Sequence, residues 1–402
     1  MSIPSTVAPI FYDQSQILSI SPQLDELIMQ CDQLLSEANQ TVVDADKHIE
    51  LAKSASESLQ RPLALQQRAR AAELQMRQLR ARAGISAPRP EVFISFGHCT
   101  IQGRRATNED AHAVTLVELD GRRFNIAGVF DGHAGDQAAI FCGENYTQML
   151  QQNEMFPAAI DSALRTCFLQ MDRAFLQTCR QSGCTAVAAV FDAESNVLYT
   201  ANAGDARCVI GTRQKYIEGT HDHKPNEIGE RARVEAAGSF VTTMFGVPRV
   251  NGMLAVSRAI GDDEYKQFGV IAEPDVHVFE VDDLEYILLA CDGLFDVLNN
   301  EQVDSIVRGC FGLIQPEEEY PLDDQMKLFQ KVARYYMEGN VEEADQCLLA
   351  AAGMTFVNFK VCTEPTQNMT REDRCAATMT RMAYLLGSTD NITVLIGLVD
   401  QN

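Results

Sequence analysis

The sequence predicts an α+β fold in which antiparallel β-sheets are flanked by α-helices, preceded by a helical extension. Two observations carry this prediction. After residue 91, short runs rich in Val, Ile and Leu alternate with helical patterns, whereas residues 1–90 show helical periodicity only. With 402 residues, of which 46% are hydrophobic and 22% charged, the chain has the composition of a folded globular protein.

The extension, residues 1–90, is predicted to be helical. From Leu24 to Ala52 apolar or small side chains recur at alternating spacings of four and three, which is typical of an amphipathic helix with a narrow seam. Ser21–Pro22 provides its N-cap and first residue. Pro62 interrupts the pattern, and the stretch from Arg61 to Arg82 carries six arginines. We expect a helical hairpin or one long helix, a regulatory or docking appendage that packs on the main domain or pairs with a helical partner.

The pattern of residues 91–402 predicts alternating strands and helices. Short spacings between Val190, Val197 and Val209 indicate hairpins, and hence antiparallel pairing. Predicted strands cover residues 124–130, 185–191, 197–200, 276–281, 286–289 and 392–398, and predicted helices cover residues 137–150, 158–180, 227–237 and 301–310. The stretch 311–370 is less regular, acidic near residues 316–324 and helical from Gln325 to about Ala352.

Composition excludes several classes of protein. A net charge of −23 argues against nucleic acid, whose phosphates would be repelled. No apolar run reaches the roughly 18 residues that span a bilayer, and the first residues lack a signal pattern, so we expect an intracellular protein of the cytoplasm or the nucleus. The 12 cysteines are scattered without a C-x-x-C pair, which favours reduced, buried thiols.

Four aspartates lie beside predicted strands. Asp131 follows the apolar run 124–130, and Asp205, Asp292 and Asp390 adjoin further apolar runs. An aspartate at a strand end is usually a turn residue or a helix cap. So many carboxylates aimed at one place, however, tolerate proximity only around cations. Because Gly132 would let a backbone carbonyl approach the same ion, the pattern predicts a site for a hard divalent metal.

Eight motifs occur in one order along the chain. They are GRRATNEDA at 103–111, VFDGHAG at 129–135, GCTA at 183–186, ANAGDAR at 201–207, DHKP at 222–225, RVNG at 249–252 with LAVSRAIGD at 254–262, ACDGLFD at 290–296 and GSTDN at 387–391. Together they resemble the PPM family of metal-dependent protein serine/threonine phosphatases, type 2C. The resemblance implies a four-layer sandwich of two central antiparallel β-sheets flanked by α-helices. It makes residues 91–402 the catalytic domain, with an insertion around 311–370, and leaves residues 1–90 unexplained.

The resemblance also implies a binuclear Mn²⁺ or Mg²⁺ centre, with a weaker third ion. Asp131 would bridge the two ions, and the carbonyl of Gly132 would bind one of them. The other oxygen donors implied are Asp292 and Asp390 for the first ion, Glu109 and Asp110 for the second, and Asp205 and Asp296 for the third. Oxygen donors suit these hard ions, whereas zinc prefers His and Cys.

Two further residues take catalytic roles by resemblance. Arg105 matches the phosphate-binding arginine, whose guanidinium fork fits two phosphate oxygens, and the register leaves Arg104 as an ordinary charge. His133 matches the general acid that protonates the leaving Ser or Thr oxygen. The metal centre would activate a water that attacks phosphorus in line. His221 and His223 look like metal ligands, but their family counterpart is structural.

The implied function is hydrolysis of phosphoserine and phosphothreonine in phosphorylated protein substrates. A catalytically impaired binding module is the alternative; it would need a substitution at Asp131, Asp292 or Asp390, and the sequence has none. A structural calcium protein would not require His133 and Arg105, and the spacing does not match an EF-hand. Walker and Rossmann glycine motifs are absent from the sequence, which excludes kinases and dinucleotide enzymes.

Overall fold

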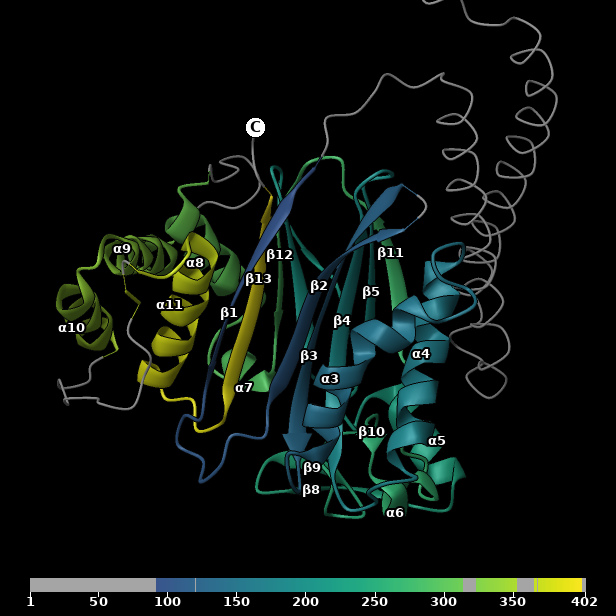
Figure 1. The fold of residues 1–402 in the computed structure, drawn as a ribbon. Coiled ribbons are helices and arrows are strands. Elements are labelled where there is room, and N and C mark those ends of the chain that lie inside the picture. Colours follow the sequence, from purple (N-terminus) through teal and green to yellow (C-terminus); the bar gives the residue numbers. More distant parts are fainter. Residues whose placement is uncertain (1–91, 120, 314–322, 353–364, 367, 400–402) are drawn as a thin grey trace, which may run out of the picture. The chain divides into compact units, whose positions relative to one another are not determined.

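The computed structural model describes residues 92–119, 121–313, 323–352, 365–366 and 368–399 (Figure 1). The predicted helical extension over residues 1–90 lies outside these residues and stays a prediction. The same holds for its docking role and its helical partner.

Two antiparallel sheets form the centre of the domain. One has five strands, in the order β1 (Ile94–Ile101), β13 (Ile392–Val399), β12 (Leu284–Ala290), β6 (Arg207–Thr212) and β7 (Tyr216–Glu218). The other has six, in the order β11 (Asp275–Glu280), β5 (Val197–Ala203), β4 (Gly183–Asp192), β3 (Arg122–His133) and β2 (Ala111–Leu119), with the short β10 (Ile260–Gly261) paired to β4. All of these pairings are antiparallel, as the sequence predicts.

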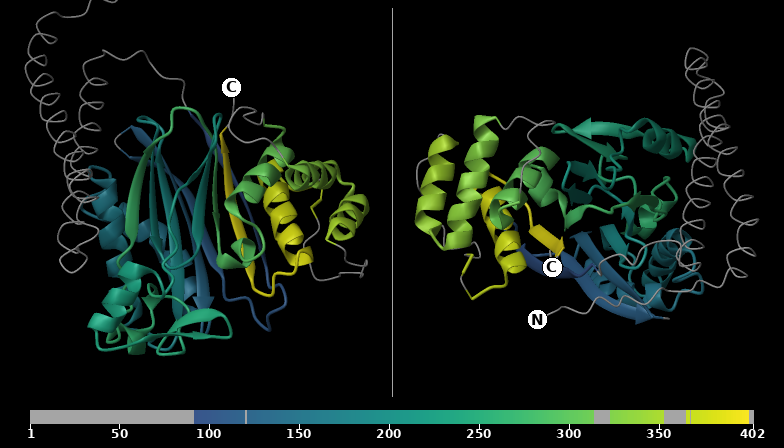
Figure 2. Two further views of the ribbon diagram at one scale, coloured as in Figure 1. Left: turned by 180° about the vertical axis from the view of Figure 1, so that it is seen from behind. Right: turned by 90° about the horizontal axis from the view of Figure 1, so that it is seen from above.

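Helices cover the outer face of each sheet (Figure 2). The six-stranded sheet is covered by α3 (Gln137–Gln151) and α4 (Ile160–Phe175). The five-stranded sheet is covered by α11 (Arg371–Leu385) and α8 (Asn300–Phe311), against which α9 (Asp324–Glu338) and α10 (Val341–Ala351) pack. This arrangement confirms the predicted four-layer sandwich.

Burial on both faces explains why the central strands are continuous apolar runs. Every residue of β4, β5 and β12 is buried. Val129, Val187 and Leu395 belong to the core between the sheets, while Val394 and Leu288 pack with the helices of the outer layer. A strand covered on both sides has no polar face, so the alternation of a half-exposed strand is lost.

The predicted helical stretch from Gln325 to Ala352 is two helices, not one. Gly339 adopts a left-handed conformation (φ 89°) and ends α9, and α10 begins at Val341. A buried ion pair between Asp345 and Arg381 (2.5 Å) ties α10 to α11. Whether this region is an insertion relative to the family stays a prediction.

Smaller elements complete the described part of the chain. They are α5 (Ile228–Ala236), the hairpin of β8 (Val241–Met244) and β9 (Val247–Val250), α6 (Asp263–Lys266) and α7 (Asp292–Phe295). The predicted helix over 158–180 is shorter than expected, because α4 already ends at Phe175. In this part of the chain no helix combines the length and hydropathy that crossing a membrane requires.

Candidate metal centre

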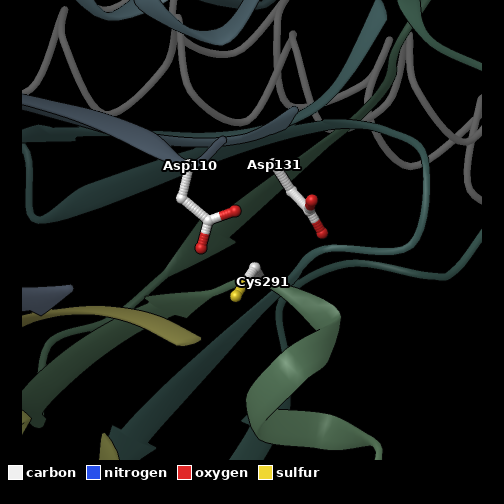
Figure 3. A group of neighbouring side chains, drawn as sticks. All are labelled: Asp110, Asp131 and Cys291. Atoms are coloured by element: carbon white, nitrogen blue, oxygen red, sulfur yellow. The ribbon is translucent and has the colours of Figure 1, made fainter. Parts of the chain in front are cut away.

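Acidic side chains from separate segments converge where β3 and β12 end and β2 begins. Asp131 lies near the end of β3, Asp110 directly precedes β2, and Cys291 directly follows β12. Their side chains are neighbours (Figure 3), with one potential ligand atom of each within 4.8 Å of the others. Asp110 Oδ2 accepts a hydrogen bond from Thr393 Oγ1 (2.6 Å), whereas its buried Oδ1 has no partner among the described residues. A buried carboxylate oxygen without a donor fits a cation.

The electrostatics of this cluster favour a cation. Burial raises the pKa of Asp131 well above its usual 3.8, and repulsion by Asp292, Asp110, Asp205 and Asp390 raises it further. The pKa of Asp110 rises to about 6, chiefly through burial. Burial, followed by the charges of Asp205, Asp296 and Asp390, raises the pKa of Asp292 well above 3.8. The aspartates named from the sequence are therefore close enough to repel one another, and a divalent ion would relieve that repulsion.

Cys291 is an unsuitable ligand despite its position. Burial and the charges of Asp110 and Asp131 raise the pKa of its thiol well above 9.0. Its sulfur accepts a hydrogen bond from the amide of Thr393 (3.1 Å) and donates to the carbonyl of Asn391 (3.5 Å). The donors that remain are oxygens, which suits Mn²⁺ or Mg²⁺.

Two glycines let the segments of the centre approach one another. A Cβ on Gly132 would collide with the carbonyl oxygen of Glu109, and a Cβ on Gly293 would collide with that of Asn391. Close backbone contact thus requires glycine at both positions. At Gly132 this is a packing reason that the sequence did not reveal, in addition to its predicted role as a carbonyl donor.

Asn391 organises the loop before β2. Its Oδ1 accepts from the amide of Glu109 (3.0 Å), and its Nδ2 donates to the carbonyls of Gln102 and Thr107 (both 2.8 Å). The Glu109 carboxylate then accepts from the amide of Gly135 (3.1 Å), on the loop after β3. It therefore faces the loop of His133, and it is outside the group formed by Asp110, Asp131 and Cys291.

The two neighbouring arginines have different partners. Arg104 donates to the carbonyls of Ser388 (2.6 Å) and Tyr384 (3.1 Å) and stacks on the Tyr384 ring, 4.6 Å from its centroid. Arg105 contacts Asp390 (Nη2 to Oδ2, 2.5 Å) and leaves 58% of its side chain exposed. Only Arg105 therefore combines contact with the carboxylate cluster and exposure to a ligand.

His133 is held by a residue that the sequence did not single out. Its Nε2 lies 2.7 Å from Oδ2 of Asp262, which is only 3% exposed. Burial alone would lower the pKa of His133. The hydrogen bond and charge of Asp262, together with the charges of Asp205 and Glu109, raise it above the usual 6.5.

Lys224 also joins the centre without having been predicted. Its ammonium donates to the buried carboxylate of Asp205, and it favours the ionised forms of Asp292 and Asp296. His223, next to it, is engaged at both ring nitrogens, by the amide of Gly204 (3.2 Å) and by Asp275 (3.1 Å). It holds the backbone in place and has no nitrogen left for a metal.

Comparison with known proteins shows the family to which the chain belongs. The sequence model of the protein phosphatase 2C family matches residues 94–344, so the chain belongs to that family. It is 39% identical over 269 residues to protein phosphatase 2C homolog 2 of Aspergillus fumigatus, covering 60% of this chain and 61% of that protein. It is 40% identical over 234 residues to protein phosphatase 2C homolog 2 of Schizosaccharomyces pombe, covering 54% and 62%. The chain thus spans less than two thirds of the length of these relatives.

Two solved structures share the fold. One is a Caenorhabditis elegans sex determining protein, with a TM-score of 0.54 and 19% identity, covering 86% of this chain and 74% of that chain. The other is serine-threonine phosphatase 2C from Toxoplasma gondii, with a TM-score of 0.53 and 21% identity, covering 78% and 98%. At these identities the similarity supports the fold alone.

Proposed function

We propose that this chain is a metal-dependent protein phosphatase that hydrolyses phosphoserine and phosphothreonine in proteins. The observation that carries the proposal is the carboxylate cluster around Asp131, with an exposed arginine and an oriented histidine beside it. Asp131, Gly132, Asp292 and Asp390 would hold one Mn²⁺ or Mg²⁺ ion, and Asp131 would bridge to a second. The other residues assigned from the sequence are Glu109 and Asp110 for the second ion, and Asp205 and Asp296 for a weaker third.

When bound, the ions would supply an acidified water and offset the charge of the phosphate. In this proposal Arg105 holds that phosphate. Its guanidinium has five N–H donors, and Nη2 makes the contact with Asp390. We propose that the other donors bind phosphate oxygens. The residue is thus tethered at the cluster and open to a ligand.

In this proposal His133 protonates the leaving oxygen. A serine or threonine alkoxide leaves poorly without a proton, so hydrolysis of these esters gains from a general acid. Contact with Asp262 raises the pKa of His133 against the lowering effect of burial, which favours the protonated imidazole that a general acid requires. Because Nε2 faces Asp262, Nδ1 is the nitrogen left to serve the substrate.

The test is hydrolysis of a phosphothreonine peptide with Mn²⁺ by wild type and Asp131→Asn. We expect turnover to fall by about 100-fold or more, because the variant loses the bridging carboxylate. Asp373→Asn, a partly exposed carboxylate on α11, is the matched control and should keep wild-type activity. Full activity in excess chelator, or a normal rate for Asp131→Asn, would contradict the mechanism. A wild-type chain that binds the phosphopeptide without turnover would instead be the impaired binding module.

A further inference from the structure

Asp262 occupies a position that several segments build together. It follows β10 and precedes α6, and its carboxylate contacts His133 at the end of β3 (Oδ2 to Nε2, 2.7 Å). The residue is 3% exposed. Burying a carboxylate costs folding free energy unless it has a specific partner. Among the described side chains, the hydrogen-bond partner of Asp262 is His133.

The register of three strands explains how the two side chains meet. In β4, Gly183 pairs with His133 of β3 on one side and with Gly261 of β10 on the other. A Cβ on Gly183 would collide with the carboxylate of Asp262. Glycine at this point of β4 therefore leaves the space through which Asp262 reaches His133 across the intervening strand.

The backbone of Asp262 is strained to serve this contact. Its φ of 54° and ψ of 47° lie in the left-handed region, which disfavours most side chains and tolerates Asp and Asn best. Asp172 fixes the turn from outside, since it accepts the amide of Gly261 (2.8 Å) and pairs with Lys266 (3.0 Å). Strain held in place by surrounding contacts is typical of functional positions.

Ser182 ties this turn to the loop of His133. Its carbonyl accepts the amide of Asp262 (3.2 Å), and its hydroxyl donates to the carbonyl of Gly135 (3.0 Å). The same hydroxyl accepts the amide of Ala138 at the start of α3 (3.1 Å). The imidazole and its carboxylate partner are thus attached to one rigid framework.

We propose that Asp262 is a positioning residue that accepts the Nε2–H of His133 and thereby aims Nδ1 at the leaving oxygen. This inference rests on the proposed general-acid role of His133. As the bond between phosphorus and the leaving oxygen breaks, its electron pair stays on that oxygen, which takes the Nδ1 proton. His133 becomes a neutral imidazole that keeps its Nε2–H on Asp262, and solvent later restores the Nδ1 proton. Asp262 never touches the substrate.

The experiment compares two substrates that differ in their need for a proton. Asp262→Asn keeps the left-handed backbone but loses the charge. We expect kcat for a phosphothreonine peptide to fall about 10- to 100-fold, within the range of general-acid contributions. For p-nitrophenyl phosphate, whose leaving group is stable without a proton, kcat should change by less than about threefold. KM should stay the same for both. Asp262→Gly, which also accepts a left-handed backbone, should show the same selectivity if Asp262→Asn proves unstable.

Two controls separate the possible failures. Asp263→Asn alters the half-buried neighbour that pairs with Arg180 and should leave both rates unchanged. In a His133→Ala background, Asp262→Asn should add no further loss, because positioning has nothing left to act on. Equal losses on both substrates, or additive losses in the double variant, would overturn the inference. If His133→Ala itself fails to discriminate between the substrates, the general-acid role falls and the inference falls with it. If His133→Ala discriminates and Asp262→Asn does not, only the role of Asp262 is wrong.

Discussion

The substitution Asp131→Asn, which we expect to slow turnover, should also stabilise the metal-free domain. In chelator, Asp131 faces the charges of Asp292, Asp110, Asp205 and Asp390 without a cation between them. Asp131→Asn removes one of the repelling charges and keeps the shape of the side chain. A carboxyl whose pKa is raised by folding destabilises the folded state whenever it is ionised. The free energy of unfolding in chelator at pH 7.5 should therefore increase.

The structure gives the size of this effect. The pKa of Asp110, in the same cluster, rises from 3.8 to about 6. Each pKa unit is worth about 1.4 kcal/mol, so ionising one such carboxyl costs of order 3 kcal/mol, mostly through burial and in part through repulsion by neighbouring carboxylates. We expect Asp131→Asn to gain about 1–3 kcal/mol, or a Tm increase of a few degrees for a domain of this size. With Mn²⁺ present, wild type should be the more stable of the two proteins, because it binds the ion more tightly.

The sign of the pH dependence follows from the raised pKa values. Stability from such a carboxyl is fully present below its unfolded pKa and is lost as pH rises through the folded pKa. The advantage of Asp131→Asn should therefore be largest at pH 7.5 and shrink toward pH 5.5. The difference between the two proteins is the quantity to follow. The stability of wild type alone also depends on His112, whose pKa is lowered to about 4 by burial and by His98. Protonation of His112 on acidification destabilises the folded state in both proteins.

Thermal unfolding in excess chelator at pH 7.5 and 5.5 measures this difference. Asp345→Asn is the contrasting control. Its carboxylate is buried but paired with Arg381 (2.5 Å) and Tyr336 (2.5 Å), so this variant should melt earlier than wild type. An Asp131→Asn protein that melts at or below wild type in chelator at pH 7.5 would refute the reasoning. So would an advantage that grows toward pH 5.5.

Two further predictions concern how the centre is assembled. Lys224→Met leaves Asp205 without its cation, so binding of Mn²⁺ should tighten about tenfold by calorimetry, as one lost charge–charge contact of about 1.4 kcal/mol implies. Lys224→Arg should bind as wild type does, and an unchanged affinity in Lys224→Met would count against the idea. Gly132→Ala should cost about 2 kcal/mol or more of unfolding free energy, since its Cβ would collide with the Glu109 carbonyl. Gly229→Ala, whose Cβ meets nothing within 4 Å, is the control and should be neutral or stabilising; equal losses in the two alanine variants would rule out the collision.

The sequence predicted the layers of the fold because burial on both faces produces a visible pattern. The apolar runs at 185–191 and 286–289 correspond to the fully buried strands β4 and β12. Loop chemistry was harder to predict. The break between α9 and α10 depends on the left-handed conformation of Gly339, and an isolated glycine within a helical pattern does not reveal its φ.

For the candidate site, too, the sequence revealed some residues and not others. Carboxylates beside apolar runs were visible in the sequence, because a strand end fixes where its next side chain lies. Asn391, Asp262 and Lys224 act through partners in other motifs of the chain, at residues 109, 133 and 205. Each of them lies inside a recognised motif. The motif shows that the residue is there, but not which strand it will face.

Electrostatic repulsion explains why motifs reveal the carboxylates but not the contacts that stabilise them. A list of carboxylates drawn from motifs is a list of mutually repelling groups, and such a list cannot show how the folded chain tolerates them. The structure shows part of the answer, because Lys224 contacts Asp205 and Arg105 contacts Asp390. Asp131 has no ion-pair partner among the described residues, and its pKa is raised well above 3.8. The protein's own cations thus compensate the periphery of the cluster and leave its centre uncompensated. That uncompensated centre is where an external divalent ion gains most, because it both satisfies Asp131 and relieves the groups around it.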